Sequence, residues 1–130
     1  MSSDPVADTV KTIKEFITDL RKNIFTKPDE EGDILLVEFF FGKMDPQALT
    51  NHVVKHVLPH SDAIEKRKVS FFIEKKEQIF GGLKKERVDY FASLVEKSES
   101  DGGLSDEDRA VIWSYFDVLV ELSRQYKKNI

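Results

Sequence analysis

Apolar residues that recur at steps of three and four most constrain how this chain folds. After Asp4-Pro5 the recurring residues are Val6, Val10, Ile13, Phe16, Ile17, Leu20 and Ile24. This spacing matches one face of an amphipathic helix, and an acid followed by proline is a typical helix start. The Lys27-Pro28 pair ends the pattern, because proline disfavours helical angles at the residue before it. The segment is therefore predicted to be a helix.

Similar start and stop signals divide the rest of the chain. Asp45-Pro46 opens a helix that Pro59 ends near Val57. Asp62 and Glu65 resemble a capping box, which predicts a helix running to about Gln78, where Gly81-Gly82 follow. Two more helices are predicted, one near 84–97 and a long last one capped by Ser105 and Asp108.

The run ILLVEFFF, residues 34–41, is the most ambiguous segment, because apolar runs of this length occur in buried strands and buried helices alike. No partner strand is visible elsewhere in the sequence, so we predict a helix that is buried over most of its surface. The predicted fold is all-α, a compact bundle of about six helices in a single domain, residues 1–130.

Composition narrows the class of protein. Forty per cent of the 130 residues are hydrophobic and ten are phenylalanine, which is enough apolar surface for a core. The absence of cysteine excludes disulfides, thiol catalysis and thiolate zinc sites. The longest apolar stretch is far shorter than the ~20 residues that cross a bilayer, and the first ten residues lack a secretory signal pattern. We therefore expect a soluble, intracellular protein without membrane association.

All three histidines lie in the stretch NHVVKHVLPH, at His52, His56 and His60. Histidines four apart on a helix can share a metal ion, but no glutamate occupies the position that a metalloprotease helix needs. On a helical wheel His56 falls on the buried arc and His52 at its margin, while His60 lies beyond Pro59. Histidines hydrogen-bonded within or beside the core explain the pattern without a metal, so no metal site is predicted.

Other motifs that carry chemistry are incomplete. The loop KSESDGGLSDED does not match a calcium loop: aligned on Gly103 it ends with Arg109, and aligned on Gly102 it begins with Lys97. FGGLKKER lacks the spacing of a phosphate-binding loop. No serine sits in a nucleophile elbow, and no glycine fingerprint follows a strand. We therefore predict no catalytic residues, no cofactor and no enzymatic activity.

The most informative segment for binding is residues 65–87, which carries a net charge of +4 in a chain of −4. Its bases alternate with Phe71, Phe72 and Phe80, a combination that suits phosphate contact and base stacking. Almost none of the bases has an acid three or four residues away on its own predicted helix. A solvated or intramolecularly paired face, a nucleic-acid contact and a contact with an acidic protein all fit this pattern.

The last predicted helix is apolar over a broad arc that includes Trp113, Phe116 and Val120. A deep core explains this breadth most simply, and a homodimer or partner contact centred on Trp113 is the alternative. The residues predicted to contact a protein partner or nucleic acid are Lys66, Arg67, Lys75, Lys76, Lys84, Lys85, Arg87 and Trp113.

The order of four sequence pieces resembles a known group. KHVLPHSDAIEKRKVSFF, IFGGL, VDYF and LSDEDRAVIWSYFDVLVEL are similar to small α-helical proteins of nucleocytoplasmic large DNA viruses, the marseillevirus-like group especially, over roughly residues 39–128. Those proteins are largely uncharacterised, so no residue role carries over. The resemblance implies a viral accessory or virion-packaged protein that acts in the host cytoplasm, the viral factory, the virion or the nucleus.

Two functions follow as expectations. The first is a non-enzymatic helical interaction module that binds a viral or host protein. The alternative is a nucleic-acid-binding accessory protein that uses the basic 65–87 segment on phosphates, although the negative net charge opposes tight non-specific binding.

Overall fold

The computed structural model describes residues 4–129, and every regular element within this range is helical. The long helices are α1 (Pro5–Asp19), α2 (Glu31–Gly42), α3 (Pro46–His56), α7 (Lys85–Glu96) and α8 (Asp106–Lys128). Between α3 and α7 lie three short helices, α4 (Ser61–Glu65), α5 (Ser70–Glu74) and α6 (Lys76–Phe80). The predicted all-α class is confirmed.

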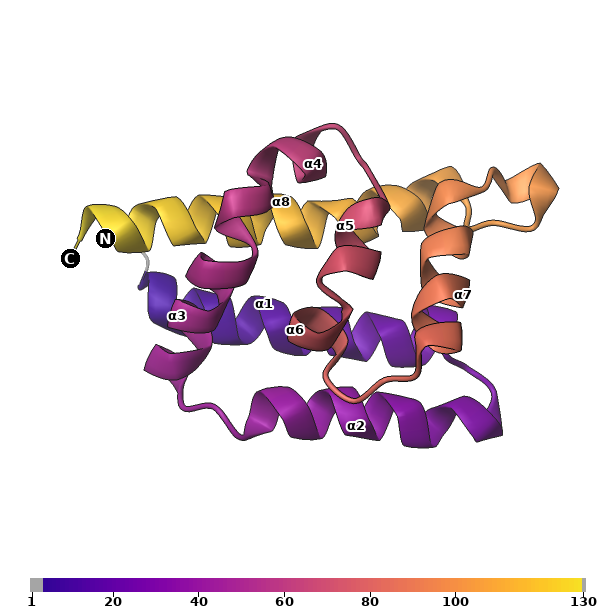
Figure 1. The fold of residues 1–130 in the computed structure, drawn as a ribbon, viewed down its shortest axis with the longest axis horizontal. Helices are drawn as coiled ribbons and strands as arrows, with labels where there is room; N and C mark the ends of the chain where they lie inside the picture. The colour runs from indigo at the N-terminus through magenta and orange to yellow at the C-terminus, as the bar shows by residue number, and fades with distance from the viewer. Residues whose placement is uncertain (1–3, 130) are drawn as a thin grey trace.

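The helices form two groups that cross each other. Figure 1 shows α8, α1 and α2 running across the view one below another, with the segment from α3 to α7 crossing them. The first helix packs chiefly against the last, and α3 packs against both. The helix α2 lies on the side of α1 opposite α8 and contacts α6. In this view α2 forms the lower edge of the molecule.

Three of the predicted helix starts have the expected caps. The carboxylates of Asp4 and Asp45 accept the N–H groups of Val6 at 3.0 Å and Ala48 at 2.7 Å, and Ser105 Oγ caps α8. Each side chain pairs a backbone N–H that the helix itself leaves unpaired. The first helix also continues past α1, but its last turn, Leu20–Ile24, is a wider π-helical turn.

The predicted helix from Asp62 to Gln78 is wrong, because this segment forms three short helices. The first begins at Ser61, so Asp62 is not its cap. It ends at Glu65, and Arg67, two residues further on, adopts a left-handed conformation with φ of 56°. The N–H groups of Arg67 and Lys68 then donate to carbonyls of the preceding turn, a helix ending that usually carries glycine.

The core is one continuous cluster of apolar side chains with Phe72 of α5 at its centre. The ring centroids of Phe91, Trp113 and Phe116 lie 5.0, 4.9 and 5.2 Å from the centroid of Phe72. This cluster joins α5 to α7 and α8 and holds the short helices in place. Within residues 4–129, no helix has both the length and the apolar composition that crossing a membrane requires.

Candidate functional site

The structure corrects the prediction that residues 34–41 form a helix buried over most of its surface. In α2 the side chains of Ile34, Val37 and Phe41 are buried against the core. The opposite side leaves Leu35, Leu36 and Phe39 with 54%, 47% and 65% of their surface exposed. We call these three residues the α2 face. Helices of globular proteins usually turn a polar side to water, so an apolar one marks a candidate contact surface.

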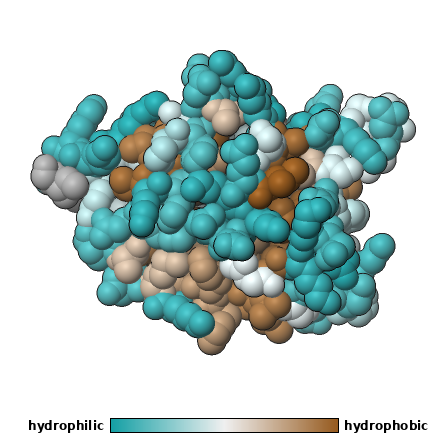
Figure 2. Space-filling view, viewed as in Figure 1, coloured by the Kyte–Doolittle hydropathy of each residue, from teal (hydrophilic) through white to brown (hydrophobic). Residues whose placement is uncertain are grey.

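The surface around the α2 face is hollowed on two sides. Figure 2 shows hydrophobic residues gathered along the lower edge of the molecule, where Figure 1 places α2. One hollow of about 530 Å³ lies over the face itself, next to Glu38 and Gly42. A second groove of about 320 Å³ shares these two residues and runs between α1, α2 and α3, where apolar side chains line most of it. The two hollows therefore adjoin at Glu38 and Gly42.

A network of ion pairs fixes the start of α2 to α7. The guanidinium of Arg87 donates to Asp29 at 3.0 Å, to Glu30 at 3.2 Å and to Asp33 at 2.7 Å. The Glu30 side chain is buried and also accepts the N–H of Lys27, so its charge is fully paired. The Arg87 hydrogen bond lowers the pKa of Asp29, and the same contact raises the pKa of Arg87.

The two arginines of the predicted binding set therefore serve the fold. Arg87 is the tie between α7 and α2. Arg67 makes two hydrogen bonds of 2.7 Å to the carboxylate of Asp117 in α8, and its guanidinium lies 5.6 Å from the centre of the Trp113 ring. Both guanidinium groups donate hydrogen bonds to acceptors within the molecule. Few of their N–H groups are left to bind a phosphate.

The lysines of the set divide into paired and unpaired groups. Contrary to the expectation that same-helix acids are almost absent, Lys66 pairs with Asp62 at 3.2 Å and Lys85 with Asp89 at 3.4 Å. Among the described residues, the remaining lysines of the set make no ion pair: Lys75, Lys76 and Lys84. The structure therefore does not gather the predicted bases into one free basic surface.

Trp113 lies in the core, so the prediction that it is a contact residue is wrong for this structure. Its side chain is only 3% exposed and packs beside Phe72. The simpler interpretation of the broad apolar arc of the last helix, a deep core, agrees with this position. The sequence analysis predicted burial over most of the surface of α2 and offered a contact at Trp113 as the alternative to a deep core. In the structure Trp113 is buried and one side of α2 is exposed.

The three histidines contact other parts of the fold. His52 Nε2 lies 2.7 Å from the carbonyl oxygen of Gln78, which ties α3 to α6, and the His60 ring packs against Phe71. Among residues 4–129 no three histidine or acidic side chains are placed to hold a metal ion. His56 differs from the other two, because its Nδ1 atom is buried without a hydrogen-bond partner. Burial, and after it the nearby His52 and Lys75, lowers the pKa of His56.

Acidification is expected to destabilise the protein through His56. Its pKa is lower in the folded chain than the ordinary 6.5, so below about pH 6.5 the unfolded chain binds a proton that the folded chain does not. The free energy of unfolding should then fall by up to about 1.4 kcal/mol per pH unit until the folded pKa is reached. Urea unfolding at pH 7, 6 and 5 measures this slope. His56→Gln should flatten it, and an unchanged slope in that variant would assign the effect to other groups.

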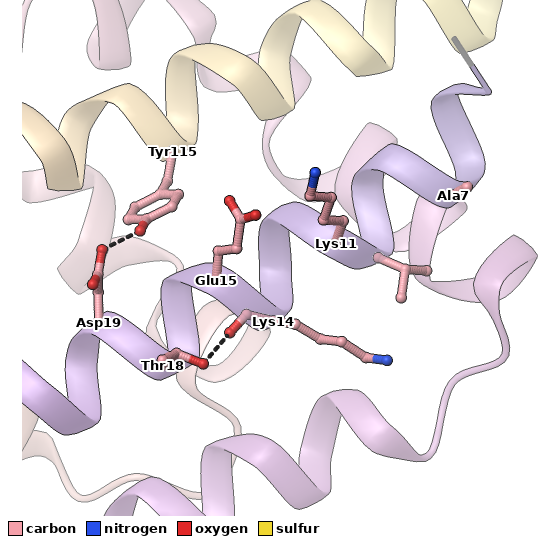
Figure 3. Close-up of a pocket in the computed structure, with 8 residues that line it drawn as sticks. Ala7, Lys11, Lys14, Glu15, Thr18, Asp19 and Tyr115 are labelled. Atoms are coloured by element: carbon pink, nitrogen blue, oxygen red, sulfur yellow. Dashed lines mark hydrogen bonds between the residues drawn. The ribbon is translucent and has the colours of Figure 1, made fainter.

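A further open groove of about 560 Å³ lies between α1 and α8, shown in Figure 3. The hydroxyl of Tyr115 donates to Asp19, and Thr18 Oγ1 donates to the carbonyl of Lys14 at 2.9 Å. Burial and the Asp19 contact raise the pKa of Tyr115, which keeps its phenol protonated. Figure 3 also shows that Lys11 and Lys14 point apart. The Tyr115 contact joins α8 to α1 and the Thr18 contact lies within α1, so these polar groups do not converge on a common point as reacting groups must.

Comparison with known proteins adds no identification, because no family model, curated protein or solved structure matches the chain. The resemblance to marseillevirus-like proteins therefore stays a prediction. The α2 face is a feature of the described residues that core packing and internal pairing leave unexplained. The sequence analysis did not predict this exposed face. The available signal was the run at residues 34–41, whose apolar side chains fall on every side of a helix.

Proposed function

We propose that this chain is a non-enzymatic helical interaction module and that a protein docks on the α2 face. The single observation that carries the proposal is the exposure of three large apolar side chains on one side of a helix. Helix faces of this kind are covered in protein complexes by an apolar surface of similar shape. Aromatic side chains such as Phe39 commonly supply much of the binding energy in such contacts.

The rigid attachment of α2 supports the same proposal. Its start is held by Arg87, and its middle by a 2.5 Å ion pair between Glu38 and Arg21. Its buried side packs into the core through Ile34, Val37 and Phe41. A surface that is already ordered loses little conformational freedom when a partner docks, and this favours affinity.

The biological setting that we propose rests on the sequence resemblance alone. It is that of a viral accessory or virion-packaged protein, with a viral or host protein as the partner, in the host cytoplasm or the viral factory. The nucleic-acid alternative has less support than protein docking. Its arginines are paired within the fold, and of its predicted contacts only Lys75, Lys76 and Lys84 form no ion pair among the described residues.

Replacing Phe39 by glutamate tests the proposal, because it places a charge in the centre of the α2 face without touching the core. Affinity capture of the tagged chain from cells that express it, followed by quantitative mass spectrometry, should show proteins that the variant retains about tenfold less than the original chain. Circular dichroism verifies that both are folded.

Val118→Glu is the matched control, since Val118 is an exposed apolar residue of α8 away from α2. We expect this variant to capture the same proteins as the original chain. Equal capture by the Phe39→Glu variant, both of other proteins and of an untagged copy of this chain, would remove the α2 face as the docking site.

A further inference from the structure

We infer that the protein docking on the α2 face is a second copy of this chain, with the two α2 helices packed side by side in opposite directions. This inference rests on the proposed function, because it names the partner of the same surface. Three observations carry it: the spacing of residues along the exposed side of α2, the glycines at both ends of that side, and the charges beside them.

The spacing of residues along the exposed side of α2 is the same from either end. Gly32, Leu35, Phe39 and Gly42 follow one another at steps of three, four and three. In an antiparallel pair centred at the level of Val37, Leu35 lies level with Phe39 of the second copy. Steps of three and four form the contact line of helices that cross at about 20°. A two-fold axis between the helices repeats each contact, as a closed dimer requires.

The glycines permit the ends of the two helices to approach closely. Gly32 and Gly42 are both exposed, and a Cβ atom at either position would meet nothing within 4 Å in the single chain. Internal packing therefore does not require glycine at these two places. In the antiparallel pair Gly32 of one copy lies level with Gly42 of the other. The absence of side chains there lets the two backbones come together.

Charges at the two ends of α2 favour the antiparallel direction. Glu31 and Lys43 are exposed, and within residues 4–129 neither forms an ion pair. The antiparallel pair brings Glu31 of each copy to the level of Lys43 of the other, whereas a parallel pair would oppose like charges. In the single chain the Lys43 ammonium lies 4.6 Å from the centre of the Phe39 ring. Swinging that ammonium toward a carboxylate uncovers the ring for contact.

The α2 helix has 12 residues, so the contact is small and the dimer is expected to be weak. Sedimentation equilibrium of the purified full chain over a wide concentration range should show a mass that rises from 15.0 kDa toward twice that value. Phe39→Glu should raise the dissociation constant at least tenfold, and Val118→Glu should leave it unchanged.

Two pairs of variants test the antiparallel arrangement. Glu31→Lys and Lys43→Glu should each weaken self-association, because each opposes like charges. An equimolar mixture of the two should associate at least tenfold more tightly than either alone, because every opposed pair is then of opposite sign. The chain has no cysteine, so Gly32→Cys and Gly42→Cys variants introduce single thiols at positions with open space. Oxidation should cross-link a mixture of these two and neither one alone.

A monomer at every concentration would overturn the inference, as would a dimer that Phe39→Glu leaves intact. Cross-links within each single cysteine variant, with none between the two, would overturn the antiparallel direction. The capture experiment distinguishes the failures. If Phe39→Glu still loses captured proteins while the purified chain stays monomeric, the α2 face binds a different protein and the proposed function stands. If neither effect occurs, both proposals fail.

Discussion

Phe72→Ala is expected to lower the free energy of unfolding by about 4 kcal/mol, because it removes a buried ring and leaves a cavity. The Phe72 ring contacts three other aromatic rings of α7 and α8, and its side chain is fully buried. It is also, with Phe71, one of the two buried residues of α5, which has five residues and cannot form a stable helix by itself. Urea unfolding followed by far-ultraviolet circular dichroism measures the loss.

The neighbouring residue supplies the control for this experiment. Ile73 is an exposed apolar residue of the same short helix, so Ile73→Ala should change the free energy of unfolding by less than about 1 kcal/mol. Similar losses for the two variants would mean that α5 is not anchored through Phe72 in the way that the core geometry indicates.

Gly81→Ala should destabilise the chain by about 3 kcal/mol, for two separate reasons. The backbone of Gly81 has a φ of 63°, which side chains with a Cβ atom rarely adopt. An added Cβ would also lie 2.7 Å from both Cβ and Cγ of Phe40 in α2, so that ring would have to move. The turn after α6 therefore presses against α2 at a point where only glycine fits. Thermal and urea unfolding both report the expected loss.

Gly82→Ala is the matched control, one residue further along the same turn. A Cβ at Gly82 meets nothing within 4 Å, and its φ is not in the left-handed region. We expect a change within about 0.5 kcal/mol, since alanine also restricts the unfolded chain. If Gly81→Ala proved equally neutral, the close approach to Phe40 would not hold the turn.

The parts of the fold that the sequence predicted correctly depend on neighbouring residues. Asp4, Asp45 and Ser105 each accept an N–H group two or three residues further on, so their effect is visible in a short window. The break at Arg67 has no such local signal. Its left-handed backbone is supported by an ion pair with Asp117, 50 residues away, which only the folded chain brings close.

The candidate site was missed for the same physical reason. The apolar run in α2 indicates that some of its side chains are buried, but which side is covered depends on how α1 and α6 pack against it. The attachment of α2 through Arg87 joins residues 54 to 58 positions apart. Sequence patterning identified the bases of residues 65–87, and the acidic partners of Lys66 and Lys85 lie only four residues away. The partners of Arg67 and Arg87 are distant in the sequence and became apparent only in three dimensions.

The pairing of the first helix with the last has a consequence for the chain during its synthesis. Phe16 of α1 packs edge to face on Phe116 of α8, with ring centroids 5.3 Å apart. The end of α1 precedes the start of α8 by roughly 90 residues, so at typical translation rates α1 waits roughly 5 to 20 s for its partner. During that interval α3 and, to a lesser extent, α2 are the long helices that pack on α1 in the described structure. The nascent chain therefore completes its core only after α8 has left the ribosome.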